Sequence, residues 1–107
     1  MSTEVMVSFD AQLDALRDVD RRRLLRALLN AEEADLPIGL DQPEYETAER
    51  GVLVSLQHVH LPKLEDPGFV DANLDQHSVT RGPRFDEIEP LLEFLETNRD
   101  RLPADWV

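Results

Sequence analysis

The chain has 107 residues, which is enough for one domain with a single hydrophobic core. It contains no cysteine, and this excludes disulfides, thiolate metal sites and cysteine nucleophiles. We find no run of about 18 apolar residues and no basic leader followed by an apolar stretch. The sequence therefore predicts a cytoplasmic protein without a membrane span or a secretory signal.

The chain is strongly acidic. It has 23 acidic and 11 basic residues, of which only Lys63 is a lysine, so the net charge is −12. In dilute salt such a chain repels nucleic acid, because binding to phosphates depends largely on Lys and Arg. At molar salt the Debye length is about 3 Å and this repulsion is mostly screened. The composition favours a halophilic cytoplasm, and an acidic interaction module is the alternative.

The first half of the chain predicts two helices after a flexible tail, Met1–Ser8. Phe9, Leu13 and Leu16 recur at helical spacing and predict a short helix that ends near Arg17. Asp18 is the expected N-cap of a second helix that runs to about Ala31. That helix is expected to bury Leu24, Leu25, Leu28 and Leu29, with Arg21, Arg22, Arg23 and Arg26 on its polar side.

The middle of the chain predicts a broken segment and then a long helix. Pro37, Gly39 and Pro43 interrupt residues 31–49, which have room for at most one short helix around 43–48. A third strong helix is expected from about Thr47 to Leu61. Pro62 should stop it, with a brief continuation over residues 63–66 before Pro67-Gly68.

The last third predicts a β-hairpin followed by an amphipathic helix. Val70, Ala72 and Leu74 alternate with polar residues, and Asp75-Gln76 is the expected turn into a second strand over residues 77–81. Residues 86–98 are expected to form a helix capped by Asp86. Residues 99–107 are expected to be a C-terminal tail.

Two motifs resemble a known superfamily. They consist of Leu13, Leu16, Asp18, Arg21, Leu24 and Leu25, and of His58, His60, Leu61, Leu64, Gly68, Phe69 and Val70. Across residues 9 to 98 the chain resembles winged helix-turn-helix proteins, especially ArsR-like repressors. The stretch VSLQHVHLPKLEDPGFVD, together with the acidic composition, is also similar to small haloarchaeal winged-helix proteins.

The resemblance implies a fold and a function. The fold class is mainly α with a small β-hairpin, in the order α-α-α-α-β-β-α. The implied function is a sequence-specific DNA-binding transcriptional regulator adapted to high salt, and its partner is double-stranded DNA. The alternative is a winged-helix protein-protein interaction module that does not bind DNA. His60 is expected at the edge of the core, donating to a backbone carbonyl, as the matching histidine does in the similar families.

The candidate DNA-binding residues lie on the long helix and on the hairpin. On the helix, Gly51, Ser55 and His58 form the face expected in the major groove, with Arg50 and Gln57 beside it and Lys63 placed for a phosphate. On the hairpin, His77, Arg81 and Arg84 are the candidates for backbone or minor-groove contact. The alternatives are a solvated helix face, and pairing of Arg81 and Arg84 with Asp86 or Glu87.

The sequence predicts neither a metal site nor catalysis. His58 and His60 are two residues apart on a helix, which separates them by about 200°. The chain has no Gly-rich phosphate loop and no GxSxG motif, so we expect no enzyme, no cofactor and no small-molecule substrate.

The apolar stripe of the last helix predicts a homodimer. Ile88, Leu91, Leu92 and Leu95 recur at spacings of three and four, and the stripe is wide for a small domain to cover. The alternative is that the stripe packs entirely within the monomer. The sequence leaves open whether Trp106 joins that interface.

Overall fold

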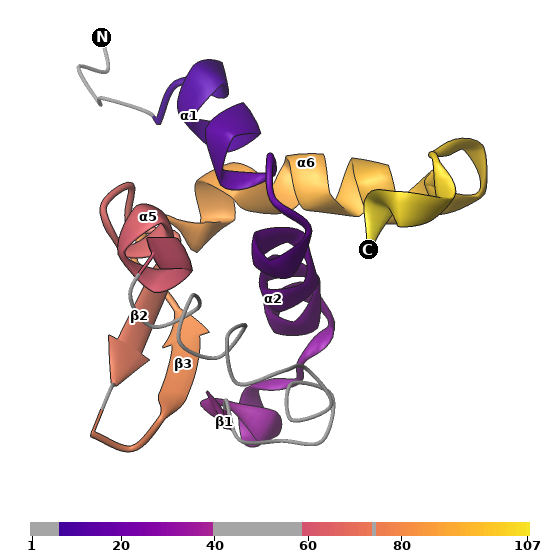
Figure 1. Cartoon of the computed structure of the whole chain (residues 1–107). Coiled ribbons are helices and arrows are strands. Elements are labelled where there is room, and N and C mark those ends of the chain that lie inside the picture. Colours follow the sequence, from indigo (N-terminus) through magenta and orange to yellow (C-terminus); the bar gives the residue numbers. More distant parts are fainter. Residues whose placement is uncertain (1–6, 40–58, 74) are drawn as a thin grey trace, which may run out of the picture.

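The protein is mainly helical with a small three-stranded antiparallel sheet (Figure 1). The computed structural model describes residues 7–39, 59–73 and 75–107. The α-helices are α1 (Phe9–Ala15), α2 (Val19–Asn30), α5 (Leu61–Glu65) and α6 (Phe85–Thr97). The strands are β1 (Ile38–Gly39), β2 (Val70–Asn73) and β3 (Ser78–Arg81). Short 3₁₀ helices are η1 (Glu33–Asp35), η3 (Arg99–Arg101) and η4 (Ala104–Trp106).

The first two helices begin at capping residues. The Ser8 hydroxyl accepts a hydrogen bond from the Ala11 amide, and the Asp18 carboxylate accepts one from the Asp20 amide at 2.8 Å. The prediction that Asp18 caps the second helix is therefore confirmed. The predicted apolar side of the first helix was wrong, because Phe9 is 61% and Leu13 47% exposed. This short helix instead contacts the core through its C-terminal end, at Ala15 and Leu16.

The sheet has the order β1-β3-β2. The predicted hairpin is confirmed as β2 and β3, which pair antiparallel with Ala72 opposite Val79. The third strand was not predicted. In β1, Ile38 pairs with Val79 and Gly39 with Ser78. A two-residue strand is too short to show alternation, so only its pairing with β3 identifies it.

A glycine turn joins α5 to β2. The Gly68 amide donates to the Glu65 carbonyl and the Phe69 amide to the Leu64 carbonyl, the two bonds of a Schellman C-cap. Gly68 has a φ of 83°, which a residue without Cβ adopts at little cost. The predicted end of the helix at Pro67-Gly68 is confirmed, and the turn carries Phe69 into the core.

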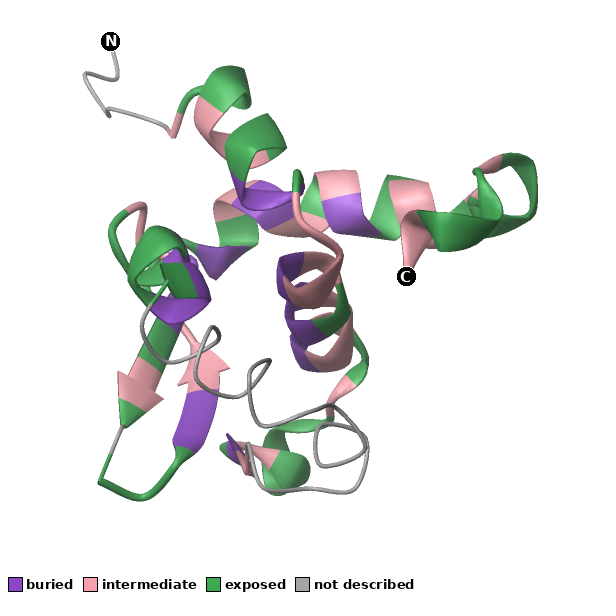
Figure 2. Ribbon diagram, viewed as in Figure 1, coloured by how far each residue is buried: buried purple, intermediate pink, exposed green. Residues whose placement is uncertain are grey.

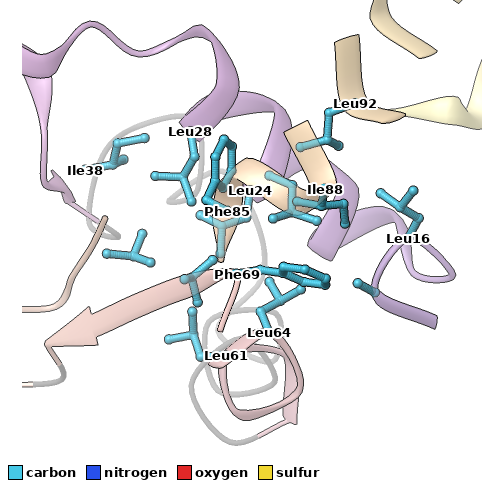
Figure 3. Close-up of a cluster of buried hydrophobic side chains, with 14 residues drawn as sticks. Leu16, Leu24, Leu28, Ile38, Leu61, Leu64, Phe69, Phe85, Ile88 and Leu92 are labelled. Atoms are coloured by element: carbon cyan, nitrogen blue, oxygen red, sulfur yellow. The ribbon is translucent and has the colours of Figure 1, made fainter. Parts of the chain in front are cut away.

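The core lies between α2, α5, α6 and the inner face of the sheet. Figure 2 shows that each of these elements turns its buried side inward. Figure 3 shows Phe69 between Leu64 and the side chains of α2 and α6. The fully buried large residues are Leu24, Leu25, Leu28, Leu61, Leu64, Phe69, Val70, Val79, Ile88 and Leu92.

The apolar stripe of α6 belongs to this core. Ile88 is 0% and Leu92 1% exposed, while Leu91 and Leu95 are partly buried against the core cluster. Ile88 and Leu92 are therefore covered within the monomer, whereas Leu91 and Leu95 stay partly exposed. The homodimer itself stays a prediction.

Val7, within the predicted N-terminal tail, and the predicted C-terminal tail both contact the rest of the fold. The Val7 amide donates to the Glu87 carboxylate, and Val7 packs against the core. At the other end η4 lies against α2, where Arg22 donates to the carbonyls of Asp105 and Trp106. The Arg22 guanidinium also lies 5.9 Å from the centre of the Trp106 ring. The residues flanking the predicted domain thus make contacts with α2 and α6.

Arg22→Gln is expected to release this C-terminal segment. The substitution removes the donors to Asp105, Trp106 and Leu16, and we expect a loss of about 1 kcal/mol of stability. Trp106 is the only tryptophan, so its fluorescence emission should shift to longer wavelength as the ring meets water. Arg23→Gln, whose side chain is 57% exposed, is the control and should leave the emission unchanged.

A salt bridge joins α2 to α6. The Arg26 guanidinium donates to both oxygens of Glu96, at 2.8 and 3.0 Å, and the two side chains are 31% and 19% exposed. The hydrogen bond from Arg26 lowers the pKa of the Glu96 carboxyl below its ordinary 4.5. The ionised Glu96 is therefore favoured more in the folded than in the unfolded chain.

This pair predicts part of the acid sensitivity of the fold. Since the folded pKa of Glu96 is depressed, its contribution to stability is present above about pH 4.5 and is lost as the pH falls through the folded value. Glu96→Gln should remove about 1 kcal/mol at pH 7 and flatten the stability curve below about pH 4.5. Urea unfolding as a function of pH measures both effects. An unchanged acid limb in the variant would contradict the assignment.

In the described residues, no helix is long and apolar enough to cross a membrane.

Candidate nucleic-acid interface

The predicted DNA-binding residues fall into two groups. Arg50, Gly51, Ser55, Gln57 and His58 lie outside the described residues. Lys63, His77, Arg81 and Arg84 lie on α5, on the hairpin turn, at the end of β3 and just before α6. The structure therefore gives the positions of the four residues in the second group.

Lys63 and Arg84 lie at the base of the hairpin. Lys63 is exposed on α5, which follows a π-helical turn at Val59 and His60. The Arg84 amide donates to the Gly68 carbonyl, and this fixes Arg84 beside the turn between α5 and β2. Its side chain is 48% exposed, with the nearest Glu87 oxygen at 3.9 Å. The pairing that the sequence left open for Arg84 exists, but it is long and partly solvated.

His77 lies at the other end of the hairpin. It is exposed in the three-residue turn before β3 and has a φ of 49°. The turn is held by the Asn73 carboxamide, whose oxygen accepts a hydrogen bond from the Gln76 amide. His77 and the pair at the base, Lys63 and Arg84, thus mark opposite ends of the hairpin.

Arg81 serves the fold instead. Its guanidinium donates to the Leu28 carbonyl at 2.9 Å and to the Ala31 carbonyl, and it lies 5.6 Å from the centre of the Phe85 ring. These carbonyls belong to the C-terminal end of α2, where backbone acceptors lack intrahelical partners and a cation is favoured. The alternative pairing of Arg81 with a carboxylate is not seen among the described residues, while its contact with DNA stays a prediction that has fewer free donors than expected.

The buried Arg21 of α2 links this helix to α1 and to His60, just before α5. Arg21 is only 3% exposed and donates to the carbonyls of Asp14 and Ala15 at the end of α1, at 2.8 and 3.1 Å. Its third contact is His60 Nδ1, at 3.4 Å. Since a guanidinium only donates, Nδ1 is the acceptor. The prediction of Arg21 on the polar side of its helix was wrong.

His60 lies at the core edge, as predicted, but with other partners. It is 8% exposed, and its Nε2 lies 3.6 Å from the Asp18 carboxylate rather than on a backbone carbonyl. Burial raises the pKa of Asp18, but the Asp20 amide, His60 and Arg21 together lower it below its ordinary 3.8. His60 thereby connects the start of α5 to the junction of α1 and α2.

Asp18, Asp20 and His60 also have ligand atoms within 4.8 Å of one another. The Asp18 carboxylate is already the N-cap of α2, at the positive end of the helix. On the far side of the imidazole Arg21 donates to Nδ1, the atom that carries the proton when Nε2 binds a metal. We interpret the cluster as part of the helix junction.

Comparisons with protein-family models, curated proteins and solved structures give no significant match.

Residues 59–84 are nearly neutral in charge, although α2 and the residues flanking it, with five arginines and two aspartates over residues 17–31, are more basic. This segment, which spans α5 and the hairpin, has three basic and four acidic residues, whereas the whole chain has a net charge of −12. Nearly all the excess negative charge therefore lies elsewhere.

Proposed function

We propose that the protein is a sequence-specific DNA-binding transcriptional regulator with a winged helix-turn-helix fold, adapted to high salt. The observation that carries the proposal is the order of elements after His60: a short helix, a glycine turn and a two-stranded hairpin braced by β1. A winged helix presents a helix and a wing to DNA in this order. The near-neutral charge of residues 59–84 also supports DNA binding through this surface, since it lowers the electrostatic repulsion between the protein and DNA phosphates.

Only a few cations remain for phosphate contact under this proposal. Arg81 is occupied at α2, which leaves Lys63 and Arg84 among the described candidates and Arg50 among the others. Three phosphate contacts predict a slope of log K against log salt of magnitude about 3 or less. Affinity should then depend mainly on base edges, apolar contacts and hydration.

Binding to genomic DNA fragments at roughly 0.5–3 M KCl tests the proposal. We expect selection of a defined sequence, with the shallow salt slope given above. The absence of specific binding over this whole range would contradict the proposal and favour the protein-interaction module.

Lys63→Gln is expected to weaken binding to every bound sequence by a similar factor and to reduce the salt slope by about 1. The reason is that an exposed lysine at this position contacts phosphate rather than bases. Arg101→Gln removes the same charge from exposed η3, at the end of the molecule remote from the hairpin (Figure 1), and should change neither quantity. Equal effects of the two variants would mean that only the net charge matters.

A further inference from the structure

The outer face of the hairpin carries four polar residues in two cross-strand pairs. Asp71 lies opposite Thr80, and Asn73 lies opposite Ser78. Because successive side chains of a strand alternate between faces, these residues share the face opposite to Val70 and Val79. Val70 and Val79 are 2% and 1% exposed in the core. The polar set therefore lies on the side of the sheet that faces away from the core.

This polar face is hollowed. A cavity of about 340 Å³ lies over it, with Leu36 and Pro37, just before β1, among its lining residues. Figure 1 shows β1 beside β3, and the pairing of Gly39 with Ser78 holds the Leu36-Pro37 segment at this edge. The volume is near the lower end of the range of about 300–1,000 Å³ for small-molecule sites. The cavity thus has an apolar wall and a polar floor.

Two polar groups of the floor, on Ser78 and Asp71, are not paired with other described side chains, whereas the Asn73 oxygen already accepts from the Gln76 amide. Ser78 is only 7% exposed, yet its hydroxyl makes no hydrogen bond to another described residue. The hydroxyl oxygen is not among the fully buried unpaired atoms of the described residues, so it opens to the cavity and can bond to water or to a ligand there. Asp71 is the only ionisable residue of the lining, and within the described ranges its carboxylate forms no ion pair.

We propose that this cavity binds a small organic cation, an alkylammonium compound. The ammonium group would donate to the Asp71 carboxylate and to the hydroxyls of Ser78 and Thr80, while the carbon chain lies against Leu36 and Pro37. An anionic ligand is disfavoured by Asp71 and by the net charge of −12. This site is independent of the proposed DNA-binding function, because its ligand binds the free protein.

The test is a titration of the full chain with 1,4-diaminobutane in 2 M KCl, followed by NMR and calorimetry. At this salt concentration, roughly the regime where the Debye length is below about 3 Å, nonspecific attraction to surface carboxylates is screened. We expect saturable binding of one molecule per chain, with chemical-shift changes at Leu36, Asp71, Ser78 and Thr80. Succinate, a dianion of similar length, should not bind.

Matched variants separate a site from general attraction. Asp71→Asn should weaken binding about 10-fold, and Ser78→Ala about 3-fold, because each removes an acceptor for the ammonium group. Asp75→Asn removes the same charge from the exposed hairpin turn outside the lining and should leave affinity unchanged. Unchanged chemical shifts in the core confirm that each variant is folded.

Three outcomes overturn the proposal. They are no saturable binding of 1,4-diaminobutane, equal loss in Asp71→Asn and Asp75→Asn, and shift changes that map outside the cavity. In each case the polar floor is satisfied by water alone.

Discussion

Arg21→Met is expected to lower the free energy of unfolding by about 3 kcal/mol. Methionine keeps most of the length of the side chain but donates to neither Asp14 nor Ala15, whose carbonyls end α1. The buried Ala15 carbonyl then lacks its charged donor, the partly buried Asp14 carbonyl keeps the Arg17 amide, and His60 Nδ1 loses its contact as well. Chemical denaturation, with the slope of the transition compared between variants, measures the change.

Two further variants separate charge from geometry at this position. Arg21→Lys keeps the positive charge, but a single ammonium does not reproduce the forked contacts with two carbonyls and His60, so we expect an intermediate loss. Arg23→Met changes an exposed side chain of the same helix and should cost less than about 0.5 kcal/mol. A loss in Arg21→Met no larger than in Arg23→Met would contradict the junction described here.

Gly82→Ala is expected to cost about 3 kcal/mol. An added Cβ would lie 2.4 Å from the Gly68 carbonyl oxygen and 2.7 Å from the Val70 amide nitrogen. Both are backbone atoms, and hydrogen bonds from the Arg84 amide to the Gly68 carbonyl and from the Gly82 amide to the Phe69 carbonyl hold this segment in place. The clash of the added Cβ is therefore relieved only if the base of the hairpin separates from the α5–β2 turn. We expect this separation to lower the melting temperature.

Gly68→Ala is the matched comparison for the close approach at Gly82. Its added Cβ meets only side-chain atoms of Arg84, at 3.2 to 3.3 Å, and an exposed arginine is able to move. The remaining cost is that of a positive φ with a side chain, about 1 kcal/mol. Should Gly68→Ala prove the more damaging of the two, the close approach at Gly82 is not the dominant constraint.

Several side chains were assigned correctly from local patterns. Asp18 caps α2 as predicted, and the hairpin and the Pro67-Gly68 turn lie at the expected positions. Each of these features depends on residues within a few positions of one another. Local spacing is then sufficient, because the physical cause is itself local.

The misassigned arginines show where that reasoning fails. Arg21 lies at the helical spacing of Leu24, Leu25 and Leu28, so the periodicity already placed it on the core face of α2. Its charge led to the opposite prediction. The carbonyls that accept hydrogen bonds from Arg21 belong to another helix, α1. The carbonyl that accepts from Arg81 likewise belongs to a different element, α2. Sequence spacing does not show which acceptors the fold brings near an arginine.

By itself the sequence determined the acidic, lysine-poor character of the chain, the helices α2 and α6 and the hairpin, because these follow from composition and from contacts between near neighbours. The tertiary structure alone decided that β1 completes the sheet, that the stripe of α6 is core, and that Trp106 packs on α2. Each of these features depends on contacts between residues far apart in the chain. Such contacts are set by how the helices pack around the single core. The same packing formed the cavity between Pro37 and Ser78, which no local pattern contains.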